Sequence, residues 1–201
     1  MKKILITDPS LRDGNHAVNH QISKDVIAKY CRLISKTNIK VVEVGHGNGL
    51  GASSLSIGRA KVNLKDTIKI AKKNLSKVKL SIHSIPGFST LNQLKSAIDF
   101  GVDIFRIGCN ATEIDTSFKQ IDFCKKNNVE VWGVLMMAHL LKTNHEFEEK
   151  IKKLLSFGIN TIIIMDSAGF YTPEDVKKII KNLKKKFDKV TFGFHAHNNL
   201  G

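Results

Sequence analysis

The sequence is poor in several kinds of residue, and each scarcity excludes a class of protein. No apolar run approaches the roughly 20 residues that a transmembrane helix requires, so we expect no membrane span. The three cysteines, Cys31, Cys109 and Cys124, are scattered and lack the spacing of a metal site. This pattern is typical of free, mostly buried thiols in a reducing compartment.

Arginine is also rare, although the chain is strongly basic. Only four of the 32 basic residues are arginine, so the net charge of +14 comes mainly from lysine. Many of these lysines, such as Lys177, Lys178 and Lys181, fall on predicted helix faces, where they are usually solvated. Because nucleic-acid surfaces more often combine arginine with aromatic residues, we expect neither nucleic acid nor membrane as a partner.

What the sequence does contain is sufficient for a globular protein. Its 201 residues, 42% hydrophobic and 25% charged, predict a single domain over residues 1–201 with a sizeable core. The chain opens with Met1-Lys2-Lys3-Ile4, but the apolar run breaks at Asp8-Pro9 without a cleavage-like site. We therefore expect no signal peptide and a cytoplasmic protein.

Short apolar runs alternate with helical patterns along the chain. Runs typical of strands span residues 4–7, 41–44, 78–82, 101–107, 129–135, 161–165 and 190–194. Apolar residues at helical spacing span 23–34, 63–73, 90–100, 114–127, 146–157 and 172–186. Ser23 and Thr172 are suitable N-caps, and Pro173 suits the first position of its helix. Such alternation predicts a parallel sheet whose strands are joined by helices.

Polar side chains gather where the predicted strands end. They are Asp13, His46, His83, Asp166, Ser167, His195 and His197. Chemistry concentrated at the carboxyl ends of parallel strands is typical of a (β/α)8 TIM barrel, with an open doubly wound sheet as the alternative. An open sheet favours a phosphate-type glycine turn after its first strand, and Leu11-Arg12-Asp13-Gly14 is not one. Only about seven βα units are present, so we expect the last strand to follow residue 201.

The pair His195-x-His197 suggests a metal site. Residues two apart on a strand point the same way, so both imidazoles can face one ion. Asp13, after the first strand, can supply a carboxylate, and Asn199 can orient a ligand or water. Two nitrogens and one oxygen suit Mn²⁺, Co²⁺, Mg²⁺ or Zn²⁺. The alternative is a chance pair of histidines on a loop.

Arg12 and His16 flank the proposed carboxylate ligand. An ion of this type can bind both oxygens of a 2-oxo acid and stabilise its enolate, and Arg12 can neutralise the developing charge. His16 can act as general base for a hydroxyl proton. The structural alternatives are an ion pair for Arg12 and a loop-ordering hydrogen bond for His16.

Five motifs, in order along almost the whole chain, resemble those of one family. They are Leu11-Arg12-Asp13-Gly14-x-His16-Ala17, Val42-Glu43-Val44-Gly45-His46-Gly47-x-Gly49-Leu50-Gly51-x-Ser53-Ser54, Met136-Met137-x-His139, Asp166-Ser167-Ala168-Gly169 and Gly193-Phe194-His195-Ala196-His197-x-Asn199-Leu200. Together they resemble the 4-hydroxy-2-oxovalerate aldolases, which belong to the DRE-TIM metallolyases with an HMG-CoA-lyase-like TIM barrel. The glycine-rich loop with His46, together with His16, selects the aldolase branch of that superfamily.

The resemblance implies a class II pyruvate aldolase that cleaves a 4-hydroxy-2-oxo acid to pyruvate and an aldehyde. It assigns Asp13, His195 and His197 to the metal, most often Mn²⁺, and Arg12 to enolate stabilisation. It assigns His16 to the base, and Arg12, Ser167 and His195 to substrate binding. It further implies an acylating acetaldehyde dehydrogenase as partner, which meets a helical region and receives the aldehyde. We expect that region, and a tyrosine that assists the base, to follow residue 201.

The chain also departs from the family pattern. Asn110-Ala111 stands where the family usually has a His-Cys pair, and Ser10 stands where threonine is common. Two alternatives to the aldolase therefore stay open: a related carboxyltransferase or acyl-CoA condensing enzyme, and a non-catalytic fragment or interaction module. His46, His83 and His139 can be structural or functional, Glu43 can support the site or form a buried pair, and His20 is expected to be a loop residue.

Overall fold

The computed structural model describes residues 4–141 and 143–199, so Leu200 of the last motif lies outside them. The strands in these ranges are β1 (Thr7–Leu11), β2 (Val41–Val44), β3 (Lys79–Ser84), β4 (Ile104–Asn110), β5 (Glu130–Met136), β6 (Thr161–Met165) and β7 (Thr191–His195). The α-helices are α1 (Lys24–Ile34), α2 (Leu64–Asn74), α3 (Leu91–Asp99), α4 (Phe118–Lys126), α5 (Asn144–Ser156) and α6 (Pro173–Lys186). Short 3-10 helices are η1 (Asp13–Val18), η2 (Ala111–Ser117) and η3 (Ala138–Leu140).

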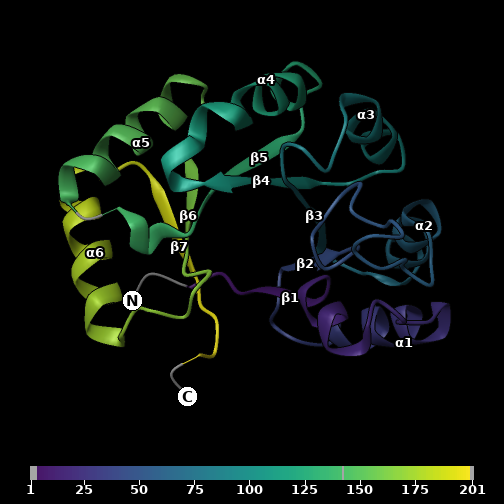
Figure 1. Ribbon diagram of the computed structural model, residues 1–201. Coiled ribbons are helices and arrows are strands. Elements are labelled where there is room, and N and C mark those ends of the chain that lie inside the picture. The colour runs from purple at the N-terminus through teal and green to yellow at the C-terminus, as the bar shows by residue number, and fades with distance from the viewer. Residues whose placement is uncertain (1–3, 142, 200–201) are drawn as a thin grey trace. The chain divides into compact units, whose positions relative to one another are not determined.

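Strands and helices alternate as the sequence predicts. The strand order from β1 to β7 follows the chain, and the labels in Figure 1 let this succession be traced. The pairs β1–β2, β2–β3, β5–β6 and β6–β7 are all parallel. Within the described residues, the predicted (β/α)8-type fold with about seven βα units is confirmed.

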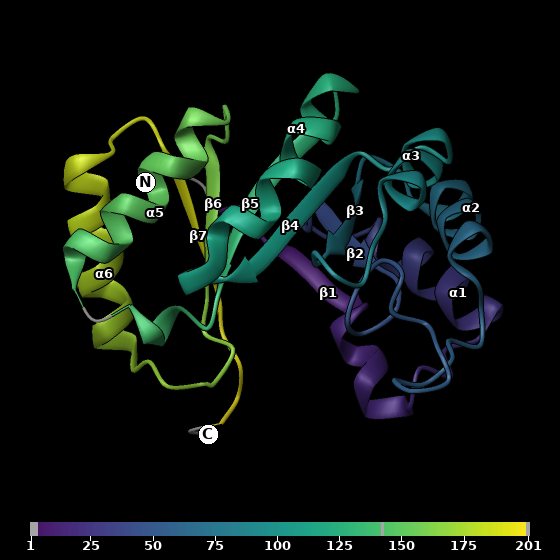
Figure 2. The ribbon, with the colours of Figure 1, turned by 45° about the horizontal axis from the view of Figure 1, so that its top comes forward.

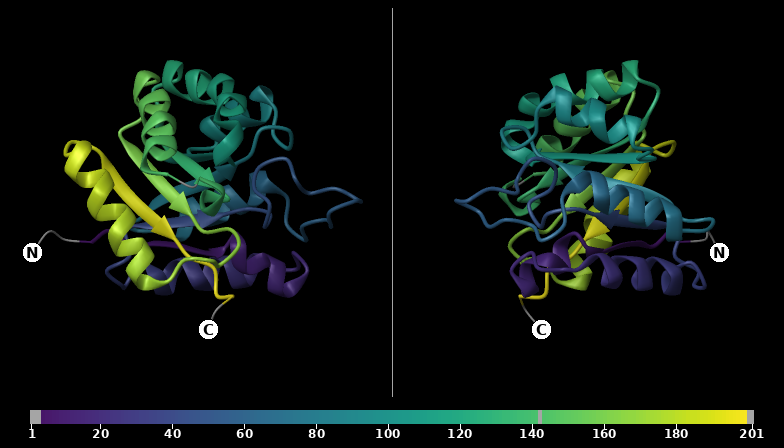
Figure 3. Two further views of the ribbon diagram at one scale, coloured as in Figure 1. Left: turned by 60° about the vertical axis from the view of Figure 1, so that its left-hand side comes forward. Right: turned by 90° about the vertical axis from the view of Figure 1, so that its right-hand side faces the viewer.

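The chain divides into two compact units. The first comprises Met1–Arg106 with Lys126–Glu130, and the second comprises Ile107–Lys125 with Val131–Gly201. In the first unit, α1 and α2 pack side by side, and α2 also contacts β2 and β3 (Figure 2). In the second unit, α6 runs alongside β7 and contacts α5 (Figure 3).

The strands supply much of the core of each unit. All four residues of β2 are buried, and in β6 only Thr161 is not, which confirms the pattern expected of strands covered on both faces. In the second unit, a Cβ at Gly133 of β5 would lie 3.0 Å from Leu154, so this glycine lets α5 pack closely on its sheet. No helix in the described ranges is long and apolar enough to cross a membrane.

The predicted N-caps start their helices. The Ser23 side chain accepts a hydrogen bond from the amide of Val26 at the start of α1. Thr172 forms a capping box with Asp175 at the start of α6, and Pro173 occupies the first turn. Both helices therefore begin at the boundary that the sequence indicates.

The predicted first strand at residues 4–7 is wrong. Residues 4–6 lie outside any strand and are exposed, whereas β1 begins at Thr7 and continues to Leu11. Pairing with β2 fixes this choice, because Thr7 lies opposite Val41 and Leu11 opposite Val44. The register shifts between Asp8 and Leu11, and Pro9 falls in that irregular stretch, where its missing N–H breaks no regular ladder.

Two helical predictions need smaller corrections. The buried side of α1 is formed by Ile27, Cys31 and Ile34. The helical spacing of apolar residues predicts that Val26 is buried as well, but it is 50% exposed. The α-helix predicted over 114–127 begins only at Phe118 as α4, and residues 114–117 belong to the 3-10 helix η2.

A buried layer of polar side chains crosses the strands of the first unit. Glu43 of β2 is fully buried and accepts a hydrogen bond of 2.7 Å on Oε2 from Nη1 of Arg106 in β4. His83 of β3 is buried close to this pair, with 2% of its surface exposed. Burial lowers the pKa of His83 to about 3; Glu43 opposes this shift, and Arg12 and Arg106 add to it.

This pKa predicts a pH-dependent stability. An unfolded histidine has a pKa of about 6.5, so between pH 6.5 and 5 the unfolded state takes up a proton that His83 in the folded state refuses. The contribution of His83 is fully present above pH 6.5 and decreases on acidification, by up to about 1.4 kcal/mol per pH unit. Urea unfolding from pH 7 to 5 measures the slope. We expect a shallower slope in His83→Asn and an unchanged slope in His145→Asn, which alters an exposed histidine of α5. Equal slopes in both variants would contradict this assignment.

Candidate active site

The first unit holds Arg12 in one orientation. Arg12 lies between β1 and η1 and is 5% exposed. Its Nε donates to Oε1 of Glu43 at 2.7 Å, and its Nη1 donates to Oδ1 of Asp13 at 2.8 Å and to the carbonyl oxygen of Gly47 at 2.9 Å. Among the described residues, Nη2 is buried and has no hydrogen-bond partner. Arg12 thus forms the ion pair that the structural alternative predicts, and also presents a buried donor.

Glu43 is the carboxylate that organises these cations. Burial alone would raise its pKa, but Arg106 and Arg12 hold the pKa of this carboxyl well below its usual range. Each of its oxygens accepts a hydrogen bond from one arginine. Of the two alternatives left open by the sequence, Glu43 forms a buried pair, and through Arg12 it also supports the candidate site.

Asp13 and His16 lie in η1, directly after β1. Asp13 is half-buried and shares its Oδ1 with Arg12. His16 is exposed, and its ring lies against the backbone of Gly47, where a Cβ would come within 2.4 Å of Nε2. The structure therefore brings Arg12, Asp13 and His16 together beside the glycine-rich loop of residues 45–51.

Two further histidines accompany His16. His20 is 8% exposed, and its ring stacks on that of His46 with the centroids 3.7 Å apart. Burial lowers the pKa of both imidazoles, and the neighbouring histidines lower it further. His20 lies in a loop, as expected, and the structure also places its ring in a cluster with those of His16 and His46.

The second unit holds the loop after β6. Asp166 is 2% exposed, and its carboxylate accepts hydrogen bonds from the amides of Phe170 and Tyr171, both at 2.9 Å. Gly169 has a φ of +60°, and a Cβ there would lie 2.4 Å from the side chain of Asn199. The loop is thereby fixed against the segment that follows β7.

The same segment carries the two histidines of the predicted metal site. His195 is the last residue of β7, His197 follows it by two positions, and their ring centroids are 4.9 Å apart. Nδ1 of His197 lies 2.8 Å from the carbonyl oxygen of Asp166, so Nδ1 carries the proton and Nε2 the lone pair. The spacing does place both imidazoles side by side, as predicted.

Ser167 and His139 also belong to the second unit. Oγ of Ser167 accepts a hydrogen bond of 3.0 Å from the amide of Met137, which follows β5. The ring of His139 lies 5.7 Å from that of Phe170, and its Nδ1 has no partner among the described residues. Ser167 thus lies in the same unit as His195 and His197.

Sequence reasoning missed two members of these clusters. The apolar run that contains Arg106 predicts only a strand. A lone arginine within Ile104-Phe105-Arg106-Ile107 nevertheless signals a buried charge that needs a carboxylate. His20 offered only its spacing from His16, and no local pattern indicates a stack with a residue 26 positions away. For both residues, the partner lies far away in the sequence, so no local pattern identifies it.

Comparisons with known proteins agree with the motifs. The chain matches the family model described as HMGL-like over residues 3–201. It is 46% identical over 201 residues to the 4-hydroxy-2-oxovalerate aldolase of Pectobacterium atrosepticum, covering all of this chain and 58% of that protein. The 4-hydroxy-2-oxovalerate aldolase of Spirochaeta aurantia is 45% identical over 199 residues, covering 98% of this chain and 58% of that protein. The chain therefore spans less than three fifths of the length of these relatives.

Solved structures show the same fold. The N-terminal domain of a protein from Bacteroides vulgatus has a TM-score of 0.79 at 24% identity, covering 98% of this chain and 66% of its own. The carboxyl transferase domain of Rhizobium etli pyruvate carboxylase has a TM-score of 0.81 at 17% identity, covering 98% of this chain and 36% of its own. The predicted resemblance to 4-hydroxy-2-oxovalerate aldolases is confirmed by the curated relatives, and the family model establishes that the chain belongs to the HMGL-like family.

Proposed function

We propose that the protein containing this chain is a divalent-metal-dependent class II pyruvate aldolase, with residues 1–201 acting as one catalytic domain. It cleaves a 4-hydroxy-2-oxo acid, such as 4-hydroxy-2-oxopentanoate, to pyruvate and an aldehyde. The names of the curated relatives favour this reaction over the carboxyltransferase, condensing-enzyme and non-catalytic alternatives. The observation that carries the proposal is Arg12, a buried guanidinium held by Glu43, one of whose donor atoms has no partner among the described residues.

Formation of the enolate takes three events, and a proton then added to C3 converts the enolate to pyruvate. A proton leaves the 4-hydroxyl, the oxygen lone pair forms the aldehyde as the C3–C4 bond breaks, and the electrons of that bond pass into the enolate of pyruvate. Arg12 is suited to the third event, because its buried Nη2 can donate a hydrogen bond to the enolate oxygen as charge develops there. His16 is proposed as the general base that accepts the hydroxyl proton.

Substrate contacts are proposed for Arg12, Ser167 and His195. Oγ of Ser167 already accepts a hydrogen bond from the amide of Met137, which directs its hydroxyl proton away from that amide. The proton is thus directed so that it can be donated to a substrate carboxylate. This geometry supports the role that the family resemblance implies for Ser167.

Asp13, His195 and His197 are proposed as ligands of one divalent ion, with Mn²⁺ the first candidate and Co²⁺, Mg²⁺ and Zn²⁺ the others. One carboxylate and two imidazoles are a donor set that these ions accept. The contact between Nδ1 of His197 and the carbonyl of Asp166 fits this role, because histidine ligands commonly bond a backbone carbonyl through the nitrogen that does not bind metal. When bound, the ion supplies Lewis-acid polarisation of the oxygens of the 2-oxo acid.

The partner is proposed on the family resemblance alone, and the compartment on the scattered cysteines and the lack of a signal-peptide pattern. An acylating acetaldehyde dehydrogenase would accept the aldehyde product, and the protein would work in the cytoplasm. Co-purification of such a dehydrogenase with the whole protein tests the first of these proposals.

Metal dependence is tested by binding and by turnover. We expect Mn²⁺ titrated into the purified whole protein to bind with one ion per chain in calorimetry, and His197→Ala to weaken binding by at least about tenfold, since a ligand is lost. His145→Ala, which changes an exposed histidine of α5, is the control and should bind normally. Pyruvate release should stop on chelation and return with Mn²⁺. Pyruvate release that persists after exhaustive chelation would refute the metal-dependent mechanism.

The role of Arg12 is tested by Arg12→Lys. Lysine keeps the charge but lacks the planar guanidinium that donates to both Glu43 and the carbonyl of Gly47. The Nη2 donor that is proposed to bond the enolate oxygen is therefore lost. We expect kcat for aldol cleavage to fall about 10²–10³-fold, as for removal of one oxyanion donor. Decarboxylation of oxaloacetate, which yields the same pyruvate enolate, should fall in parallel. Arg59→Lys, at an exposed position, is the control, and an equal loss in both variants would remove Arg12 from the mechanism.

A further inference from the structure

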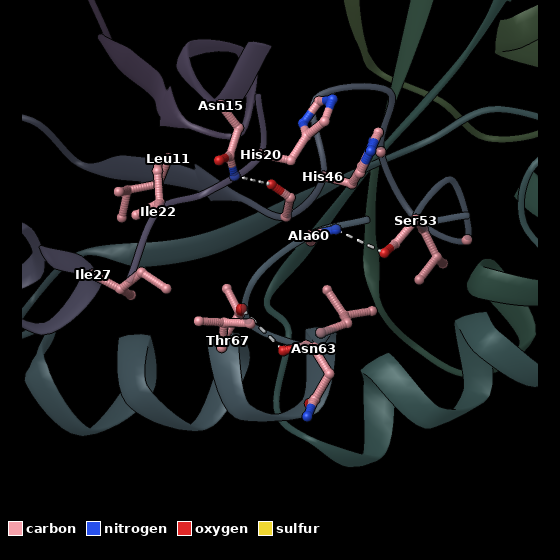
Figure 4. Close-up of a pocket in the computed structure, with 16 residues that line it drawn as sticks. Leu11, Asn15, His20, Ile22, Ile27, His46, Ser53, Ala60, Asn63 and Thr67 are labelled. Carbon is pink, nitrogen blue, oxygen red and sulfur yellow. Dashed lines mark hydrogen bonds between the residues drawn. The ribbon is translucent and has the colours of Figure 1, made fainter. Parts of the chain in front are cut away.

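Three imidazoles form a row in the first unit. The rings of His16 and His20 meet edge to face with centroids 5.1 Å apart at an angle of 70°. The rings of His20 and His46 are stacked 3.7 Å apart at 23° (Figure 4). The row thus runs from the exposed candidate base, through a buried ring, to a ring in the glycine-rich loop.

The His46 ring, at the end of the row opposite His16, is fixed by the backbone. Nε2 of His46 lies 3.1 Å from the carbonyl oxygen of Gly58, and Nδ1 accepts a hydrogen bond of 3.1 Å from the amide of Asn48. The first contact needs a proton on Nε2 and the second needs a lone pair on Nδ1, so His46 is a neutral imidazole with a defined tautomer. Its ring cannot rotate without loss of both hydrogen bonds.

The middle ring sits on a strained backbone. His20 has a φ of 61°, in the left-handed region that non-glycine residues rarely adopt. Its amide donates to the carbonyl of Asn15 at 2.8 Å, and its own carbonyl accepts from the amide of Lys61 at 2.9 Å. A Cβ at Gly58 would lie 3.0 Å from the His20 ring, so both backbone and ring are confined. Strain of this kind is found where a side chain must be held in one place.

The surroundings of the middle ring contain unused polar atoms. Nδ1 of His20 and Oδ1 of Asn15 are buried without a partner in the described residues. Both residues, with His46, line a cavity of about 60 Å³ (Figure 4). Because Nδ1 of His20 has no partner in the part of the chain that the structure describes, the ring contributes to its surroundings chiefly through its shape and stacking.

His16 depends on this row for its orientation. Within the described residues its ring makes no hydrogen bond, and it lies between the His20 ring and the backbone of Gly47. We propose that His20 and His46 are positioning residues: a stacked pair of neutral imidazoles, anchored on the glycine-rich loop, that holds the His16 ring where it takes the substrate hydroxyl proton. This inference rests on the proposed aldolase function.

The test compares two reactions of the purified whole protein. Cleavage of 4-hydroxy-2-oxopentanoate requires removal of a hydroxyl proton, whereas oxaloacetate loses carbon dioxide to give the same enolate with no hydroxyl proton to remove. We expect His20→Ala to lower kcat for cleavage about tenfold to hundredfold, because a misplaced base costs rates of that order, and to leave oxaloacetate decarboxylation unchanged. His46→Ala should show the same selective loss.

A conservative variant separates positioning from stability. His20→Phe keeps an aromatic ring in the stack and gives up Nδ1, which has no partner among the described residues, so it should recover most of the cleavage activity. His145→Ala, on the exposed face of α5, controls for the loss of any histidine. Equal loss of both reactions in His20→Ala, or no recovery in His20→Phe, would overturn the positioning role.

An NMR measurement tests the row without reference to turnover. In the wild type we expect nuclear Overhauser contacts between the His16 and His20 rings, and broadened, shifted His16 ring signals in His20→Ala. An unchanged His16 ring signal in His20→Ala would overturn the inference even if activity falls. If the wild-type protein cleaves no 4-hydroxy-2-oxo acid, the proposed function fails, and the ring contacts alone decide whether His20 orients His16.

Discussion

A buried carboxylate between two arginines is the interaction on which the first unit depends. Glu43 of β2 is fully enclosed, and its two oxygens bond Arg12, which directly follows β1, and Arg106 of β4. Removing either arginine would leave one oxygen of this buried carboxylate without its charged donor, at a cost of about 1–3 kcal/mol or more. The interaction that holds this polar layer together therefore also fixes the guanidinium of Arg12.

Glycines allow the backbone to approach the functional side chains in both units. Gly47 leaves room for the His16 ring and offers its carbonyl to Arg12, and any Cβ there would collide with the imidazole. Gly169, with its positive φ, lets the loop after β6 lie against the segment carrying His197 and Asn199. His16 and Asn199 are thus packed against main-chain atoms, which are less mobile than side-chain atoms.

Of Glu43, Asp166 and Asp13, the first two anchor cations or backbone amides, while the third is the proposed ligand. Asp166 accepts two amide hydrogen bonds and so shapes its loop, and Glu43 neutralises arginines. Asp13, half-buried and bonded to Arg12, is the carboxylate proposed to bind metal.

The sequence by itself determined the succession of elements, because apolar periodicity and caps such as Ser23 and Thr172 are local signals that the structure obeys. It also placed Asp13, Ser167, His195 and His197 after the carboxyl ends of their strands, because strand boundaries are readable from the same pattern. The apolar run at residues 4–7 predicts the wrong first strand. Only pairing with β2 shows that Thr7–Leu11 forms the strand, with Pro9 at an irregularity in the register. Tertiary structure alone decided that Glu43 joins Arg12 to Arg106 and that His20 stacks on His46, because these partners are tens of residues apart and meet only when parallel strands and their loops are aligned.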